Sequence, residues 1–369
     1  MIEKRDLFEA RQNGYRNFRI PCLVVTKKNV VLAATEARPG NGGDYEQIDI
    51  LMRRSTDGGK TFAPAVKIVD HSDYGDGPIN NFVMISDQES GRVMAVFCHN
   101  YARVFMMHSD DDGVSFCKPV EMTSVFDRFH DEYPWRVCAT GPGHGLQLRT
   151  GRMIIPVWLS DGSGSDQGGH LAHRPSVISL IYSDDHGDTW QRGPIVCRHG
   201  NVINGVTVVN PSETITVELS DGSVMINIRS ESALHRRLVA ISPDGISTWR
   251  IRGFDTALQD PVCMASILRY SWPAGDQPGR LLFANPDPIN QTETPCFDRE
   301  RLTVKMSLDD GDTWPISKVL EESYAGYSDL ALLPDGTVLC FYECGCIDHK
   351  YDSRSLRLAR FDIHFIQER

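Results

Sequence analysis

The sequence predicts an all-β protein, a six-bladed β-propeller, because two different repeats run along the chain. The first repeat is a short motif, Ser-x-Asp-x-Gly-x-Thr/Ser followed by Trp or Phe. A fifth, distorted copy at residues 242–249 has its Gly one place early. The Asp and Gly of each copy favour a tight turn, and the aromatic residue can pack beneath it. Recurrence at roughly sixty residues indicates that one supersecondary unit is repeated. The four regular copies lie at residues 55–62, 109–116, 183–190 and 307–314.

The second repeat is a pair of apolar strands, and it predicts the number of blades. Most second strands follow a Gly plus one residue, and another apolar stretch precedes each, which is typical of hairpins. Six such pairs in 369 residues give roughly sixty residues per unit, which suits a four-stranded blade. We therefore expect one domain over residues 1–369, closed by pairing of segment 357–366 with an N-terminal strand. The second strands lie at residues 30–33, 93–96, 153–156, 224–227, 281–284 and 338–341.

Composition narrows the partners and the compartment. A formal net charge of −11 argues against nucleic acid or an anionic membrane as a general partner. No apolar run approaches the roughly 20 residues that a spanning helix needs, and residues 1–6 lack the apolar stretch of a signal peptide. The ten scattered cysteines are expected to be reduced thiols in a cytoplasmic protein, or in a secreted one if a signal was removed. The oligomeric state is left open.

Blade geometry predicts where a binding site lies. The starts of first strands, the ends of second strands and the starts of third strands share one face, and the repeated turn motif lies on the other as scaffold. Several arginines and carboxylates gather on the first face, which favours a site for an anionic ligand. This face is predicted to hold Arg19, Asn81, His144, Glu213, Asp260, Tyr327, Arg38, Asn100, Trp158, Arg229, Asp287, Glu343, Asp44, Asp49, Arg174 and Arg299.

Several of these residues stand in motifs that resemble one enzyme family. Residues 18–21 are Phe-Arg-Ile-Pro, and Glu213 is followed sixteen residues later by Arg229. The turn motif is the Asp-box, and together these features resemble the bacterial-type exo-α-sialidases (neuraminidases) of the BNR Asp-box family. The similarity extends from Arg19 to Glu343. Further matching segments are Arg299 before residues 302–304, residues 326–330 and residues 341–343.

The resemblance implies that Arg19, Arg229 and Arg299 bind the carboxylate of a sialic acid. Planar guanidinium groups suit a carboxylate and stay charged at any working pH. Arg301 is a close rival of Arg299, and an ion pair between blades is the alternative role for the arginines. Glu343 would orient Arg19.

The same resemblance implies Tyr327 as the nucleophile and Glu213 as its general base. A neutral phenol avoids the repulsion that a carboxylate nucleophile would meet from the substrate carboxylate, and sialidases use Tyr for this role. Asp44, in a Gly-rich loop, would protonate the leaving oxygen, with Asp49 as the competitor and Arg38 flanking the site. The expected outcome is retention at the anomeric carbon, with no cofactor and no metal.

The resulting prediction is a hydrolase that removes terminal α-linked sialic acid, or a related nonulosonic acid, from glycoconjugates. Three alternatives are left open: a glycosidase for another acidic sugar, a transglycosylase, and a non-catalytic propeller that binds glycans. Linkage preference is also left open. Residues 160–170 form an insertion that is either a solvated loop or a lid over the leaving group, and His144 either lines the pocket or caps a turn.

Overall fold

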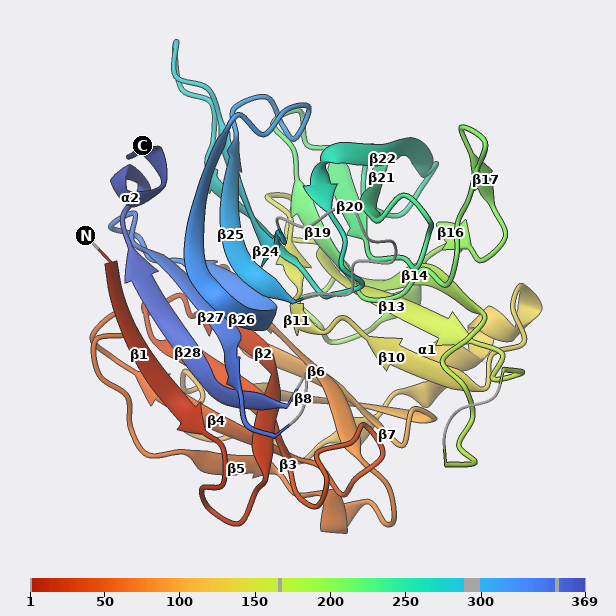
Figure 1. Ribbon diagram of the computed structural model, residues 1–369. Helices are drawn as coiled ribbons and strands as arrows, with labels where there is room; N and C mark the ends of the chain where they lie inside the picture. Colours follow the sequence, from red (N-terminus) through yellow and green to blue (C-terminus); the bar gives the residue numbers. More distant parts are fainter. Residues whose placement is uncertain (1, 165–167, 289–298, 349–351, 369) are drawn as a thin grey trace.

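The computed structural model describes residues 2–164, 168–288, 299–348 and 352–368 (Figure 1). Antiparallel β-sheets make up nearly all of its regular structure, so the all-β prediction is confirmed. The helices are short: α1 (Thr123–Asp127), α2 (Ile363–Gln367) and 3-10 turns at His71–Asp73 and Arg128–Asp131. Across these described ranges, none is long and apolar enough to cross a bilayer.

The N-terminal half of the chain forms three sheets, and in each of them the main path of paired strands contains four that follow chain order. The first sheet contains β2 (Asn17–Val25), β3 (Val31–Arg38), β4 (Asp49–Ser55) and β5 (Val66–Val69). The second contains β6 (Ile79–Ser86), β7 (Val93–His99), β8 (Arg103–Ser109) and β9 (Val120–Glu121), with the parallel β11 (Gly143–His144) beside β6. The third contains β10 (Val137–Thr140), β13 (Met153–Ser160), β14 (Ser176–Ser183), β15 (Gln191–Arg192), β12 (Leu146–Gln147) and β16 (Cys197–Arg198).

The C-terminal half continues the pattern. One sheet contains β19 (Thr214–Glu218), β20 (Val224–Ile228), β21 (Arg236–Ser242) and β22 (Arg250–Gln259), and β17 (Val202–Ile203) pairs with β18 (Val206–Thr207). The last sheet runs in the order β1-β28-β27-β26-β25-β24-β23. Its strands are β23 (Ser266–Ser271), β24 (Arg280–Pro286), β25 (Glu300–Ser307), β26 (Ile316–Leu332), β27 (Val338–Cys346), β28 (Ser353–Phe361) and β1 (Ile2–Glu9).

The long strand β26 belongs to two sets of strands. Its first half pairs with β25 and its second half with β27, so the last sheet contains two four-stranded sets that share this strand. The N-terminal strand β1 pairs with β28, with Ile2 opposite Phe361, and the two lie side by side in red and blue in Figure 1. The sequence predicts that segment 357–366 pairs with an N-terminal strand, and its residues 357–361 do so. Its final residues instead form α2, whose N-cap Asp362 accepts a hydrogen bond from the Phe365 amide.

Apolar clusters join consecutive sets of strands. The first and second sheets share one cluster, the second and third share another, and this continues along the chain. A further cluster packs Leu339 and Leu358 of the C-terminal strands against Phe18 and Leu23 of β2. Many strands, such as β7 and β13, are buried along their whole length, because each is covered on both faces.

The four regular Asp-boxes adopt the same hydrogen-bonded turn. In the third copy, the carboxylate of Asp185 accepts hydrogen bonds from Ser183 Oγ at 2.8 Å, the Thr189 amide at 2.8 Å and Thr189 Oγ1 at 2.6 Å. The amide of Gly187 donates to Ser183 Oγ at 2.9 Å. Each copy lies between the third and fourth strands of its set, and in the distorted copy Gly245 takes the Gly role one residue early.

Replacement of Asp185 by Ala is expected to lower the free energy of unfolding by about 1–3 kcal/mol, because three hydrogen bonds inside the turn are lost. Activity per folded molecule should not change. Denaturant unfolding measures the loss. The matched control is Asp184→Ala, which removes only an exposed ion pair with Arg152, for which about 0–1 kcal/mol is expected. A larger cost for the control would contradict the scaffold role.

Candidate active site

A cavity of about 280 Å³ lies where the ends of strands from several sheets meet. It collects residues from β2, β3, β6, β13, β26 and the loops around β19, β20 and β25. Its charged groups are five arginines and four carboxylates, and its apolar wall contains Trp158 and Tyr101. The lining residues are Arg19, Ile20, Glu36, Arg38, Asp44, Asn81, Tyr101, Trp158, His173, Arg174, Asn210, Ser212, Glu213, Arg229, Glu231, Arg299 and Tyr327.

Arg19 and Tyr327 are held by one buried carboxylate, that of Glu343. Arg19 Nε donates to Glu343 Oε1 at 3.0 Å, and the amides of Ile20 and Tyr327 donate to its two oxygens at 3.2 Å. Both β2 and β26 carry a register shift at this point, and such bulges re-aim side chains. A Cβ atom at Gly326 would overlap Glu343 Oε2, so this position requires Gly. Glu343 therefore lies beneath the cavity and positions residues that line it.

Tyr327, Glu213 and Arg229 form a connected triad. The Tyr327 hydroxyl donates to Glu213 Oε1 at 2.5 Å and accepts from Arg229 Nη1 at 2.7 Å. Arg229 Nη1 also donates to Glu213 Oε2. Burial raises the pKa of Tyr327 above the ordinary phenol value, although the Arg229 guanidinium acts in the opposite direction. The phenol is therefore neutral at neutral pH and has a carboxylate acceptor already in place for its proton.

Three guanidinium groups surround the ring of Tyr327. Their Cζ atoms lie 5.3 Å (Arg19), 6.0 Å (Arg229) and 5.0 Å (Arg299) from the ring centroid. Arg299 is fixed by a 2.8 Å hydrogen bond from Nη2 to the carbonyl of Val262. Its rival Arg301 does not line the cavity and pairs instead with Glu322. The structure thus brings together the three arginines that the sequence singled out.

Asp44 lines the cavity from the Gly-rich loop after β3, and its side chain is about half exposed. Arg38 Nη1 donates to Asp44 Oδ1 at 2.6 Å, and Arg38 is itself held by the buried Glu36 through bonds of 3.0 and 2.5 Å to Oε2. Desolvation opposes the charge of Asp44. The guanidinium groups of Arg38 and Arg19 outweigh that effect and hold the pKa of Asp44 below its usual range. The carboxyl side chain is exposed, so it can contact both a ligand and water.

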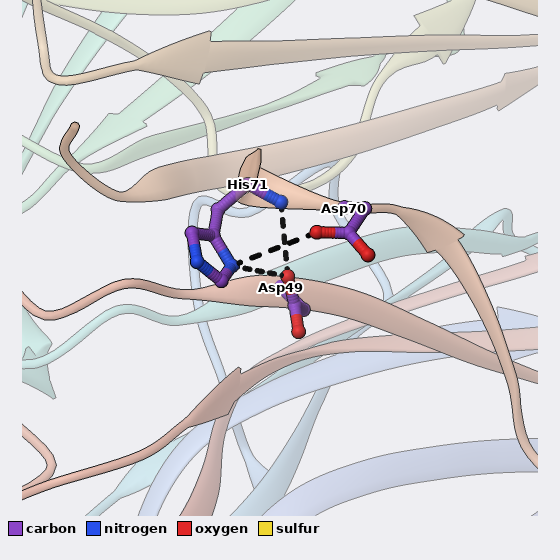
Figure 2. Close-up of side chains that lie close together, drawn as sticks. All are labelled: Asp49, Asp70 and His71. Carbon is purple, nitrogen blue, oxygen red and sulfur yellow. Dashed lines mark hydrogen bonds and ion pairs between the residues drawn. The ribbon is translucent and has the colours of Figure 1, made fainter. Parts of the chain in front are cut away.

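The competitor Asp49 does not line the cavity, and Figure 2 shows it beside Asp70 and His71 instead. Its carboxylate accepts from the Tyr15 hydroxyl at 2.5 Å and from the His71 amide at 2.9 Å, and it contacts His71 Nδ1 at 2.7 Å. Asp49, Asp70 and His71 could together offer three metal-ligand atoms. The Lys67 ammonium already lies 2.8 Å from Asp49 and 2.9 Å from Asp70, so a cation of the protein itself already offsets part of the negative charge of this cluster.

Several residues predicted on this face do not line the cavity: His144, Asp260, Asn100, Asp287 and Asp49. His144 Nδ1 contacts the buried Asp329 at 2.6 Å and lines a separate cavity of about 240 Å³. It therefore neither lines the candidate site nor merely caps a turn. His144 lies on β11, which pairs in parallel with β6.

The cavity also contains residues that the sequence did not single out. Glu36 lies two residues before Arg38 on β3, and side chains two apart share one face of a strand, so its place could have been predicted. Ser212 directly precedes Glu213, and Glu231 lies two residues after Arg229. Tyr101 and His173 are brought in by loops after β7 and β13, which carry no comparable signal.

Comparison with known proteins shows the family. Residues 29–340 match the BNR repeat-like domain. The chain is 33% identical to a sialidase of Micromonospora viridifaciens over 99% of its own length and 54% of that protein's length. The chain therefore spans about half the length of this curated relative.

Solved structures of similar fold are also sialidases or related enzymes. The Hadza microbial sialidase Hz136 matches with a TM-score of 0.79 and 25% identity, over 98% of this chain and 69% of that one. The intramolecular trans-sialidase of Ruminococcus gnavus matches with a TM-score of 0.76 and 19% identity, over 99% and 98% of the two chains. The chain belongs to the BNR repeat-like family, and the relatives named here are sialidases and a trans-sialidase.

Proposed function

We propose that this protein is a retaining exo-glycosidase that hydrolyses terminal α-linked sialic acid, or a related nonulosonic acid, from glycoconjugates. The observation that carries the proposal is the Tyr327 hydroxyl bonded to Glu213 at 2.5 Å beneath three guanidinium groups. A nucleophile that is hydrogen-bonded to a base and surrounded by an anion-binding site is an arrangement suited to catalysis. The sialidase relatives support the choice of sugar.

We also propose that residues 1–369 form a single six-bladed propeller around this site. Six four-stranded sets follow one another in the chain if β26 is divided between two of them. The apolar clusters between consecutive sets, and the one that joins the C-terminal strands to β2, support a closed ring. A ring would explain why the inner strand ends converge on one cavity.

Substrate binding begins at the arginines. Arg19, Arg229 and Arg299 offer donors to the carboxylate of the sugar, and charge-assisted bonds of this kind are the strong ones. Glu343 holds Arg19 in place from beneath. Because the chain carries a net charge of −11, this local cationic group is what would attract an anionic sugar.

The chemistry then takes two steps. Tyr327 Oη attacks the anomeric carbon while its proton passes to Glu213, and the glycosidic bond breaks as Asp44 protonates the leaving oxygen. In the second step, Asp44 takes a proton from water, whose oxygen attacks the same carbon from the vacated face. The Tyr327 oxygen leaves and recovers its proton from Glu213. Two inversions give net retention.

Fluorophore release from an aryl α-sialoside between about pH 4 and 8 tests the activity, and NMR of the first product tests retention. Turnover with an α-configured first product supports the proposal. A β-configured first product would overturn the Tyr327 mechanism, and a folded protein without turnover would overturn the activity.

The pH dependence of that reaction follows from the contacts of Asp44. Arg38 and Arg19 lower the pKa of Asp44 in the free enzyme, whereas the substrate carboxylate would neutralise part of this positive charge and raise it again. Asp44 must be protonated to act as the acid, so activity falls as pH rises through its pKa. The descending limb is therefore expected at lower pH in kcat/KM, which reports the free enzyme, than in kcat. The reverse order would contradict Asp44 as the acid.

Replacement of Asp44 by Asn should affect substrates according to their leaving groups. A methyl sialoside leaves as a poor alkoxide and needs protonation, so its kcat/KM is expected to fall about 10²–10⁴-fold. An aryl sialoside with a good leaving group should lose less than about tenfold in kcat/KM. The matched variant Asp49→Asn, outside the cavity, should show no such dependence on the leaving group.

A transfer reaction is the second candidate. The intramolecular trans-sialidase of Ruminococcus gnavus has a similar fold, and transfer needs only that another hydroxyl replaces water in the second step. Product analysis by mass spectrometry separates free sialic acid from its anhydro form and from a newly sialylated acceptor. A glycosidase for another acidic sugar would keep the same arginine group, and a binding propeller would not need the Tyr327–Glu213 pair.

A further inference from the structure

A second cavity of about 540 Å³ adjoins the first at Asp44, which lines both. His173 and Arg174 are shared in the same way. The remaining lining residues come from the Gly-rich loop after β3 and from the insertion after β13, of which residues 165–167 lie outside the described part of the chain. The second cavity is lined by Asn41, Gly43, Asp44, Tyr45, Glu46, Gly168, His170, Ala172, His173 and Arg174.

An aromatic stack forms one wall of this second cavity. The rings of Tyr45 and His170 lie 3.9 Å apart between centroids and 3° from parallel. The Tyr45 hydroxyl donates to the carbonyl of Leu171 at 2.8 Å and lies 3.0 Å from His173 Nε2. Tyr45 is therefore fixed, whereas His170 is exposed beyond it. The arrangement offers a flat apolar surface with polar edges, next to the proposed acid.

The charges of the second cavity are unlike those of the first. Among its described lining residues, the permanent cation is Arg174, and Glu231 already binds its guanidinium through contacts of 2.9, 3.1 and 2.5 Å. Asp44 is paired with Arg38, and Glu46 adds a further carboxylate. The described lining residues thus offer polar groups for hydroxyls but no uncommitted guanidinium or ammonium group for a carboxylate.

We infer that the second cavity binds the sugar ring to which the sialic acid is linked, and that it selects a neutral ring over an anionic one. This inference rests on the proposed function, because Asp44 can protonate the leaving oxygen only if the leaving group lies on the Asp44 side. A neutral hexose places its apolar ring face on the Tyr45–His170 stack. A leaving group that is itself a sialic acid meets Glu46 and finds, among the described lining residues, no uncommitted guanidinium or ammonium group.

The first test compares two substrates, a sialoside of a neutral disaccharide and methyl α-sialoside. His170→Ala is expected to lower kcat/KM for the disaccharide substrate about threefold to tenfold, in line with the loss of one aromatic contact, and to leave methyl sialoside unchanged. His170→Phe keeps an aromatic ring and should restore the ratio. The control is His130→Ala, which removes another exposed imidazole. The His130 ring stacks on Trp135 with the ring centroids 5.0 Å apart, and His130 lines neither cavity.

The second test addresses charge. The wild type is expected to prefer the neutral disaccharide over a sialic acid dimer, and Glu46→Gln should reduce that preference severalfold because one carboxylate is removed. Equal losses on both substrates in His170→Ala, or an unchanged preference in Glu46→Gln, would overturn the inference while leaving the hydrolase intact. Absence of turnover on every sialoside would instead overturn the proposed function on which the inference rests.

Discussion

Replacement of Tyr327 by Phe is expected to lower kcat for an aryl α-sialoside at least about 10³-fold. The variant loses the oxygen that attacks the anomeric carbon, while its ring still packs among the three guanidinium groups. Binding of free sialic acid should therefore persist, and calorimetric titration would show it. Loss of turnover with retained binding assigns Tyr327 to the chemical step.

A neighbouring tyrosine supplies the control. Tyr324 lies three residues earlier on β26, and its buried hydroxyl has no hydrogen-bond partner in the part of the chain that the structure describes. Tyr324→Phe should keep full activity and at least the wild-type stability, since an unpaired buried hydroxyl costs free energy. Equal activities of the two variants would exclude Tyr327 as the nucleophile.

The second large effect is expected for Arg19→Lys. Lysine keeps the positive charge but cannot present two parallel donors to a carboxylate, so kcat/KM should fall about 10²-fold or more. The loss should appear with sialosides and shrink with a substrate whose carboxylate is converted to an amide. That comparison separates carboxylate recognition from a general disturbance of the site.

Arg152→Lys is the matched variant for this experiment. Arg152 pairs with Asp184 beside an Asp-box and lines neither cavity, so its replacement should leave kcat/KM within about twofold for both substrates. If Arg19→Lys lost as much activity on the amide as on the acid, Arg19 would hold the fold of the site rather than the substrate carboxylate.

The Tyr327–Glu213–Arg229 triad carries no net charge before a substrate binds. The phenol keeps its proton because burial raises its pKa, and Glu213 and Arg229 neutralise each other. A substrate carboxylate that engages Arg229 would free Glu213 to accept the phenol proton. In this scheme, the arrival of the anionic sugar prepares the base.

The sequence by itself determined the all-β class and part of the set of residues that meet in the cavity. The spacing of the repeats and the residue types of the turns can be read along the chain, so the Asp-boxes and hairpins could be recognised without any tertiary contact. The family motifs placed Arg19, Glu213, Arg229, Arg299 and Tyr327, and all five line one cavity.

Only the tertiary structure shows that Asp44 lines the cavity and that Asp49 does not. Both follow β3 in the sequence, but the loop directs Asp44 to Arg38, whereas Asp49 begins β4 and is bonded by Tyr15, Lys67 and His71. Likewise, the contact between Tyr45 and His170 joins residues 125 positions apart, through two loops that have no repeat to follow. Strand patterns are fixed by neighbours in the chain. Loop directions depend on packing between distant segments, and no local pattern encodes that packing.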